Sequence, residues 1–243
     1  MNRLILKRSH SSQTQFSVRD EDVLSHLKGT LKVSLSDTLK ATFLDEGLGE
    51  VRVLAIHEGE GSNSIELQLE GEITPTLPKP LHLLIGVSRP PTMKKVIEHA
   101  TSMGVTHFHF FKAELSEKSY LQSKTLEAAN LSKLLSLGIS QSAQISDLPV
   151  IDFYSSLSQA FQSLPEKRFL LSLKASRKFS QVQLGKDSIA LAIGPERGWT
   201  SAEEDLLEKN NFIPIKISSD TLRVEIASFS ALGQVEMLRD HGE

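Results

Sequence analysis

The stretch IALAIGPERGWTSAEE, residues 189–204, constrains the fold of this 243-residue chain more than any other. An apolar run ends in a Gly-Pro turn, and Thr200 and Glu203 then have the spacing of a capping box, which predicts the start of a helix. Gly194 and Gly198 allow a ligand to approach the main chain closely. Open α/β sheets bind ligands where a strand leads through such a turn into a helix. Taken alone, however, an ordinary strand-to-helix turn is the simpler interpretation.

A second stretch, IKISSDTLRVEIASFSAL at residues 215–232, repeats this plan of apolar strand, polar turn and helix. Arg223 and Glu225 stand where this turn becomes the helix. The sequence has neither a G-x-G-x-x-G nor a G-x-x-x-x-G-K-[ST] motif, so neither common nucleotide-binding fingerprint applies. Two adjacent loops of this kind can instead hold an adenosine-sized ligand through their main-chain groups.

The paired segments IGPERGW and TLRVEIA resemble IGPEGGF and LRxETA, two motifs of the RsmE family of 16S ribosomal RNA methyltransferases. Upstream, MKKVIEHATSMGV at residues 93–105 is similar to the RMxxxxxKATELGV of that family, so the resemblance covers most of the chain. It implies an α/β fold with a SPOUT-type parallel sheet tied in a C-terminal trefoil knot. A small PUA-like β-barrel that helps to grip RNA is implied before it.

The resemblance also implies S-adenosyl-L-methionine as the cofactor, bound mostly by main-chain groups, and a homodimer with each active site near the interface. The positions that it assigns to the cofactor are Ile193, Gly194, Pro195, Glu196, Gly198, Ile217 and Leu222.

The reaction implied by the resemblance is methylation of a uridine N3 in 16S ribosomal RNA of the small subunit. This imide must lose its proton before it can attack, and a fixed guanidinium stabilises the resulting anion. Arg223, which aligns with the arginine of the LR motif, is expected to do so. Glu225 is expected to orient Arg223 or to accept a hydrogen bond from the substrate; a carboxylate that only stabilises the helix start is the alternative.

The positions expected to face RNA are Arg3, Arg8, Arg89 and Lys118. The sequence departs from the family pattern at Arg197, which replaces a glycine, and at Thr92 and His99, where arginine and lysine are common. Phosphate contacts supply much of the affinity for RNA. A divergent paralogue that methylates another RNA site, or a catalytically silent RNA-binding protein, therefore stays open beside the leading hypothesis.

Composition limits the class of protein. A hydrophobic content of 39% and a charged content of 23% are typical of a globular chain, and the net charge of -3 leaves RNA binding to local basic patches. One such patch, residues 167–178, is equally a solvated face. The absence of cysteine excludes disulfides and cysteine-based zinc sites. His107 and His109 share one face of a strand, but no third ligand follows by spacing, so no metal site is expected.

No apolar run is long enough to cross a bilayer, and the apolar part of the N-terminus is too short for a signal peptide. We therefore expect a cytoplasmic protein without a membrane partner.

Two domains are expected, an all-β domain at 1–74 and an α/β domain at 75–243. In the first, short alternating runs predict strands at 38–44, 50–56 and 64–70 and a helix at 20–27, and prolines at 73–80 indicate a linker. In the second, alternating strands and helices predict a mostly parallel sheet. Its strands are expected at 81–87, 106–111, 168–173, 189–193 and 213–217, and its helices at 93–103, 125–137, 155–163, 202–209 and 224–239.

Overall fold

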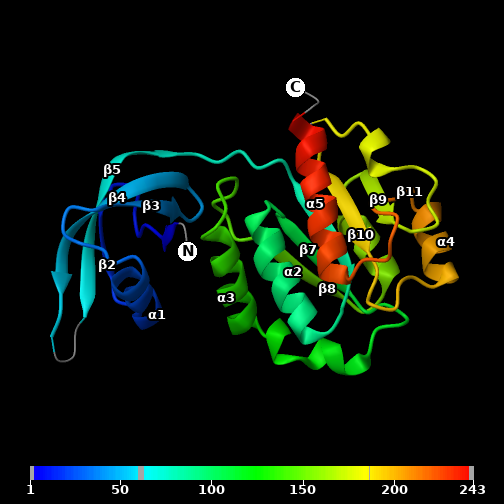
Figure 1. The fold of residues 1–243 in the computed structure, drawn as a ribbon, viewed down its shortest axis with the longest axis horizontal. Coiled ribbons are helices and arrows are strands. Elements are labelled where there is room, and N and C mark those ends of the chain that lie inside the picture. The colour runs from blue at the N-terminus through cyan, green and yellow to red at the C-terminus, as the bar shows by residue number, and fades with distance from the viewer. Residues whose placement is uncertain (1–2, 60–62, 186, 241–243) are drawn as a thin grey trace. The chain divides into compact units, whose positions relative to one another are not determined.

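The structure is a computed structural model that describes residues 3–59, 63–185 and 187–240 (Figure 1). The chain forms two compact units. The first comprises Met1–Leu77 and Ile139–Asp147, and the second comprises Pro78–Gly138 and Leu148–Glu243.

A five-stranded sheet in the order β1-β3-β4-β5-β2 forms the first unit. All pairs are antiparallel except β1 with β3, and register shifts between β4 and β5 let the sheet curl around its core, as in a barrel-like domain. Phe16 and Phe43 meet in that core with ring centroids 5.5 Å apart. The elements are β1 (Leu4–Leu6), β2 (Gln15–Val18), α1 (Glu21–Ser25) with a π-helical turn (His26–Thr30), β3 (Thr38–Phe43), β4 (Gly47–His57) and β5 (Ser64–Thr74).

Residues 139–147 belong to the first unit although they are distant from it in sequence. The main-chain N–H of Arg3 donates to Ser140 O at 2.9 Å, and the hydroxyl oxygens of Thr76 and Ser146 are 2.8 Å apart. The sequence pattern does not predict that residues 139–147 belong to the first unit, because these contacts join segments about 70 or more residues apart.

The second unit is built on a six-stranded, fully parallel sheet in the order β11-β9-β10-β6-β7-β8. The expected parallel α/β sheet is therefore confirmed. Its strands are β6 (Leu81–Gly86), β7 (His107–Phe111), β8 (Val150–Tyr154), β9 (Lys167–Leu171), β10 (Ile189–Ile193) and β11 (Phe212–Ile215). Its α-helices are α2 (Pro90–Ser102), α3 (Ala128–Ile139), α4 (Ser201–Lys209) and α5 (Val224–Asp240), and its 3₁₀ turns are η2 (Lys118–Gln122), η3 (Lys124–Leu126), η4 (Leu157–Ser163) and η5 (Phe179–Gln181).

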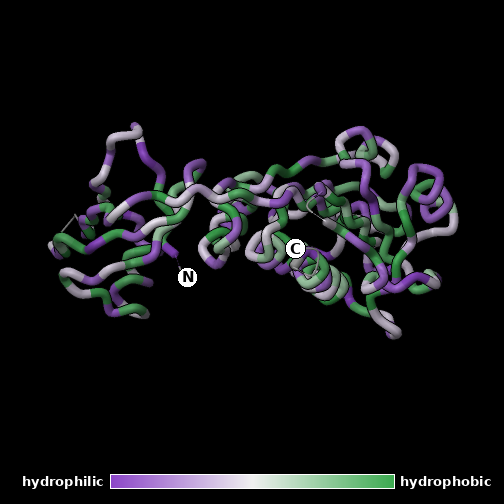
Figure 2. Tube along the Cα trace, turned by 90° about the horizontal axis from the view of Figure 1, so that it is seen from above, coloured by the Kyte–Doolittle hydropathy of each residue, from purple (hydrophilic) through white to green (hydrophobic). Residues whose placement is uncertain are grey.

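The central strands β6 and β10 are buried on both faces, as their apolar sequences LHLLIG and IALAI require. Helices α2, α3 and α5 cover one face, and α4 and η4 cover the other. Figure 2 shows hydrophobic segments running through the interior of this unit, with hydrophilic segments mainly in its connecting loops.

Two expectations for this unit are wrong. No strand is expected at Val150–Tyr154 from the sequence, yet β8 lies there at the edge of the sheet. Its residues Val150 and Phe153 are each 48% exposed, so the segment lacks the buried apolar run of the inner strands. The helix expected at 155–163 is the 3₁₀ turn η4, whose short Ser- and Gln-rich sequence gives an α-helix little support. Within the described part of the chain, no helix is both long and apolar enough to cross a membrane.

Candidate active site

A cavity of about 770 Å³ lies at the carboxyl ends of the central strands. The chain leaves β6 toward α2 on one face of the sheet and leaves β10 toward α4 on the other. Neighbouring strands whose connections diverge in this way form the crevice in which open α/β sheets bind ligands. The two loops meet closely there, since a Cβ atom on Gly86 would lie 2.9 Å from Cδ of Pro195.

The loop after β10 forms one wall. The N–H of Gly198 donates to Pro195 O at 2.8 Å and closes a turn, in which Gly198 has a φ of +74°, a conformation that favours glycine. Trp199 then folds back over Gly194. Its ring stacks on Phe111 with centroids 5.8 Å apart, and its indole N–H donates to Leu171 O at 3.2 Å.

The predicted capping box at the start of α4 is confirmed. Thr200 Oγ1 accepts from the N–H of Glu203, and a carboxylate oxygen of Glu203 accepts from the N–H of Thr200 at 2.9 Å. The other oxygen of Glu203 accepts from the N–H of Glu114, which follows β7. Glu203 is therefore a buried structural anchor that fixes the direction in which α4 leaves the cavity.

The segment after β11 forms the opposite wall. The amide of Gln234 in α5 donates to Ile217 O at 3.2 Å and ties this segment to the helix. Arg223 immediately precedes α5 and is exposed, whereas Glu225 in its first turn is 7% exposed. The strand expected to reach residue 217 ends at Ile215, so Ile217 belongs to the loop.

The structure brings together every residue that the sequence analysis assigned to catalysis or to the cofactor. They all line this one cavity: Ile193, Gly194, Pro195, Glu196, Gly198, Ile217, Leu222, Arg223 and Glu225. A third wall, Leu171 to Lys174, was not expected from the sequence, because 168–173 was assigned to a strand and Lys174 to the basic patch at 167–178. A signal was present, since β9 is a third parallel strand and ends at the same edge of the sheet.

Charges in the cavity are unevenly paired. Glu196 accepts from the main-chain N–H of Arg89 at 2.7 Å, and Glu204 accepts from Ser172 and Lys174. The hydroxyl of Tyr120, and after it the carboxylate of Glu196, hold the pKa of Arg89 above its ordinary value.

Two arginines of the cavity lack such partners. Among the described residues, the side chains of Arg197 and Arg223 have no hydrogen-bond or ion-pair partner, although both residues line the cavity. The site therefore offers free guanidinium groups to an anionic ligand.

The other positions expected to contact RNA have different surroundings. Arg89 lines the cavity, and Lys118 is exposed at the start of η2. In the first unit, the guanidinium of Arg3 donates to Ala41 O at 2.9 Å, and Arg8 forms an ion pair with Glu46. Neither of these two lines the cavity, and both guanidinium groups are already engaged.

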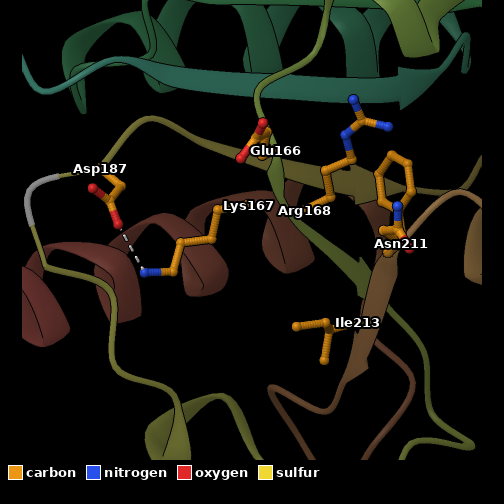
Figure 3. A pocket seen from close by; sticks show the side chains of 7 residues that line it. Glu166, Lys167, Arg168, Asp187, Asn211 and Ile213 are labelled. Atoms are coloured by element: carbon orange, nitrogen blue, oxygen red, sulfur yellow. Dashed lines mark hydrogen bonds and ion pairs between the residues drawn. The ribbon is translucent and has the colours of Figure 1, made fainter.

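A second, more open hollow of about 590 Å³ lies at the opposite, amino ends of β9 and β11 (Figure 3). Lys167 pairs there with Asp187 at 3.2 Å. Arg168 donates to four main-chain carbonyl groups, those of Phe161, Leu164, Pro165 and Asn210. Lys167 and Arg168 therefore already contact protein groups and stabilise the fold.

Three histidines stack away from the cavity, near the amino ends of β6 and β7. His82 Nδ1 and His109 Nε2 are 2.9 Å apart, and His107 lies parallel to His82 with centroids 4.1 Å apart. Burial, and then the neighbouring histidines, lower the pKa of His82 to about 3. In the part of the chain that the structure describes, no group of three or more His, Cys, Asp or Glu residues has the geometry of a metal site. His82 and His109 therefore satisfy each other within the core.

The sequence model of the RNA methyltransferase domain family matches residues 75–236, which include all three walls of the cavity. The chain belongs to this family. The resemblance to RsmE-type methyltransferases inferred from the motifs is confirmed.

Two curated relatives show how close this membership is. The chain is 34% identical over 157 residues to ribosomal RNA small subunit methyltransferase E 1 of Borreliella burgdorferi, a match that covers 63% of this chain and 65% of that relative, just under two thirds of its length. It is 28% identical over 218 residues to ribosomal RNA small subunit methyltransferase E of Treponema pallidum, covering 86% of this chain and 80% of the relative.

A solved structure agrees in fold over nearly the whole chain. It is the ribosomal RNA small subunit methyltransferase E of Neisseria gonorrhoeae bound to S-adenosyl methionine, with a TM-score of 0.77 and 19% identity over 98% of each chain.

Proposed function

We propose that this protein is an S-adenosyl-L-methionine-dependent methyltransferase that methylates a uridine N3 in 16S ribosomal RNA of the small ribosomal subunit. The observation that carries the proposal is the cavity at the divergence of β6 and β10, which combines a tight glycine turn with the guanidinium of Arg223, unpaired among the described residues. The names of the curated relatives and the cofactor in the Neisseria structure support it.

The residues of the cavity fit this cofactor. Its volume is within the range of small-molecule sites, and Gly194 lines it at a point where Trp199 leaves little room for a side chain. The apolar side chains that would face the adenosine are those of Ile193, Ile217 and Leu222. Pro195, Glu196 and Gly198 would complete the cradle through the turn after β10. When bound, S-adenosyl-L-methionine supplies an electrophilic methyl group.

Arg223 would act on the substrate. Loss of the proton from N3 leaves a negative charge spread over the uracil imide, and a permanently charged guanidinium with fixed donors stabilises it. Arg223 is suited to this role because no carboxylate among the described residues neutralises it. Glu225 would border the same site from the first turn of α5.

The finer architecture is also part of the proposal. We assign residues 1–74 to a PUA-like RNA-binding domain and residues 75–243 to a SPOUT methyltransferase domain with a C-terminal trefoil knot, as family membership and the parallel sheet support. A homodimer accounts for the apolar outer face of α5, where Ile226 and Met237, three turns apart, are 47% and 46% exposed. The cytoplasm, where ribosomal subunits are found, would be its compartment.

A second candidate is methylation of a different RNA site by the same chemistry. The engaged side chains of Arg3 and Arg8 favour it, because phosphate contacts from the first unit would require these guanidinium groups to leave their present partners. The free Arg223 disfavours a catalytically silent RNA-binding protein.

Methyl transfer from labelled S-adenosyl-L-methionine to small subunits that lack uridine-N3 methylation tests the proposal. Nucleoside mass spectrometry should detect 3-methyluridine. Arg223→Ala should lower the turnover number about 100-fold or more, as loss of a charge-stabilising donor does. Absence of 3-methyluridine with the unaltered, folded protein would refute the assignment of the substrate, and a methylated base elsewhere would favour the second candidate.

Cofactor binding is measured separately through Trp199, the single tryptophan of the chain and part of the cavity wall. Its fluorescence should change on titration with S-adenosyl-L-methionine, and Arg223→Ala should leave the dissociation constant nearly unchanged. A protein that binds the cofactor but transfers no methyl group would support the assignment of the cofactor and contradict that of the reaction.

A further inference from the structure

Glu225 is a buried carboxylate in the wall of the cavity with one partner among the described residues. It is 7% exposed, and an ion pair joins Glu225 Oε1 to Lys95 Nζ of α2 at 3.6 Å. A buried charge is stabilised only when it is paired, so Lys95 is the group that makes this position tolerable for a carboxylate.

Lys95 reaches Glu225 from outside the cavity, because α2 and α5 lie side by side (Figure 1). One turn further along both helices, His99 meets the ring of Phe229 edge-on with centroids 5.6 Å apart. The two contacts show that the helices run in the same direction with position 95 beside 225 and position 99 beside 229. His99, which stands where lysine is common, therefore faces an aromatic ring, and Lys95 supplies the cation.

The pairing of Glu225 bears directly on Arg223. These residues are two positions apart, Arg223 just before α5 and Glu225 in its first turn, and both line the cavity. Four carboxylates line the cavity. Glu196, Glu204 and Glu225 are each held by a group other than Arg223, and Asp220 is exposed and forms no ion pair with Arg223. Without Lys95, Glu225 would be a buried carboxylate without a counter-charge, and Arg223 would be a nearby cation that it could turn to.

We propose that Lys95 is a positioning residue, which holds Glu225 against α2 and thereby keeps the guanidinium of Arg223 free for the anionic substrate. This inference rests on the proposed function. It assigns to Lys95 no contact with substrate or cofactor; its effect passes through Glu225.

The test compares steady-state methyl transfer by four variants with that of the unaltered protein: Lys95→Met, Lys95→Arg, Glu225→Gln and the double variant Lys95→Met/Glu225→Gln. Lys94→Met is the matched control, because Lys94 is the exposed neighbour on the same helix. Lys95→Met should lower kcat roughly tenfold with KM for RNA and the cofactor dissociation constant little changed, the pattern of an interaction that matters in the transition state. Lys95→Arg should restore most of the activity, and Lys94→Met should behave as the unaltered protein.

The double variant decides whether Lys95 acts through Glu225. Once Glu225→Gln has removed the charge, Lys95→Met should cause no further loss of kcat. An equal loss in both backgrounds, or a raised KM at unchanged kcat, would overturn the proposal, since Lys95 would then act independently or bind RNA directly. Full activity of Lys95→Met would overturn it as well. Failure of the unaltered protein and of Lys94→Met to transfer methyl groups would instead refute the proposed function, and this role of Lys95 with it.

Discussion

The indole ring of Trp199 lies so closely over Gly194 that a Cβ atom at position 194 would come within 3.2 Å of two of its ring atoms. The ring has little freedom to move away, because it stacks on Phe111 and donates its N–H to Leu171 O. The ends of β7, β9 and β10 are thus joined through a single side chain. The shape of the cavity depends on the absence of a side chain at position 194.

Gly194→Ala should weaken cofactor binding about tenfold or more while the protein remains folded. The added methyl group displaces Trp199 or the main chain of the turn, and overpacking of this kind costs about 1–3 kcal/mol. Isothermal titration calorimetry with S-adenosyl-L-methionine measures the cofactor affinity, and urea unfolding measures the free energy of unfolding. Gly29→Ala is the matched control, because a Cβ atom at Gly29 meets nothing within 4 Å. Equal affinities of both variants would show that the turn tolerates a side chain.

Trp199→Phe should keep the ring stack but lose the hydrogen bond to Leu171 O. Leaving this carbonyl without its donor should lower the free energy of unfolding by about 1 kcal/mol. Trp199→Leu, which removes the stack as well, should lose more. Denaturant unfolding followed by circular dichroism compares the three proteins without relying on the removed fluorophore. A Phe variant as stable as the unaltered protein would mean that water replaces the indole as donor.

Thr200→Ala should destabilise the protein by about 0.5–2 kcal/mol, the usual cost of losing an N-cap side chain. Thr200 Oγ1 both caps α4 and lies 2.9 Å from Glu114 Oε2, to which it donates. Thr200→Ser retains the hydroxyl and should behave nearly as the unaltered protein in thermal unfolding. Equal melting temperatures of the Ala and Ser variants would contradict a role for the cap.

The site was predictable to the extent that it is encoded locally. The glycines and proline of residues 194–198 require a turn after β10, and the capping box at Thr200 fixes the helix that follows, so both could be inferred from the sequence. The role suggested for Arg223 came from the resemblance of its motif. The structure adds that Arg223 has no partner among the described residues, which depends on how the three glutamates of the cavity are engaged.

Features that depend on long-range pairing were not predictable. Leu171 enters the site only because β9 pairs with β10, and the contact of Lys95 with Glu225 joins residues 130 positions apart through helix packing. The edge strand β8 was missed for a related reason, since its exposed Val150 and Phe153 give no buried apolar pattern. Local periodicity reports which residues are buried but not which distant residues they meet.

The stacked histidines predict an acid-sensitive fold. Burial is the main cause that lowers the pKa of His82 to about 3 and that of His109 to about 4, with His107 acting in the same direction and Asp152 opposing it at His109. In an unfolded chain both imidazoles titrate near pH 6.5. Between about pH 4 and 6.5 the unfolded chain therefore binds protons that the folded chain excludes, so the free energy of unfolding is fully present above about pH 6.5 and falls as the pH decreases below it.

Urea unfolding from pH 7.5 down to 4.5 measures this dependence. Near pH 5 the slope of the unfolding free energy should correspond to the uptake of about two protons by these two groups, in addition to the contribution of His107, whose pKa burial also lowers. His109→Gln keeps a side chain able to hydrogen-bond to His82 and to the hydroxyl of Tyr154, and it should reduce the slope by about one proton. A slope equal to that of the unaltered protein would mean that His109 takes up its proton in the folded state.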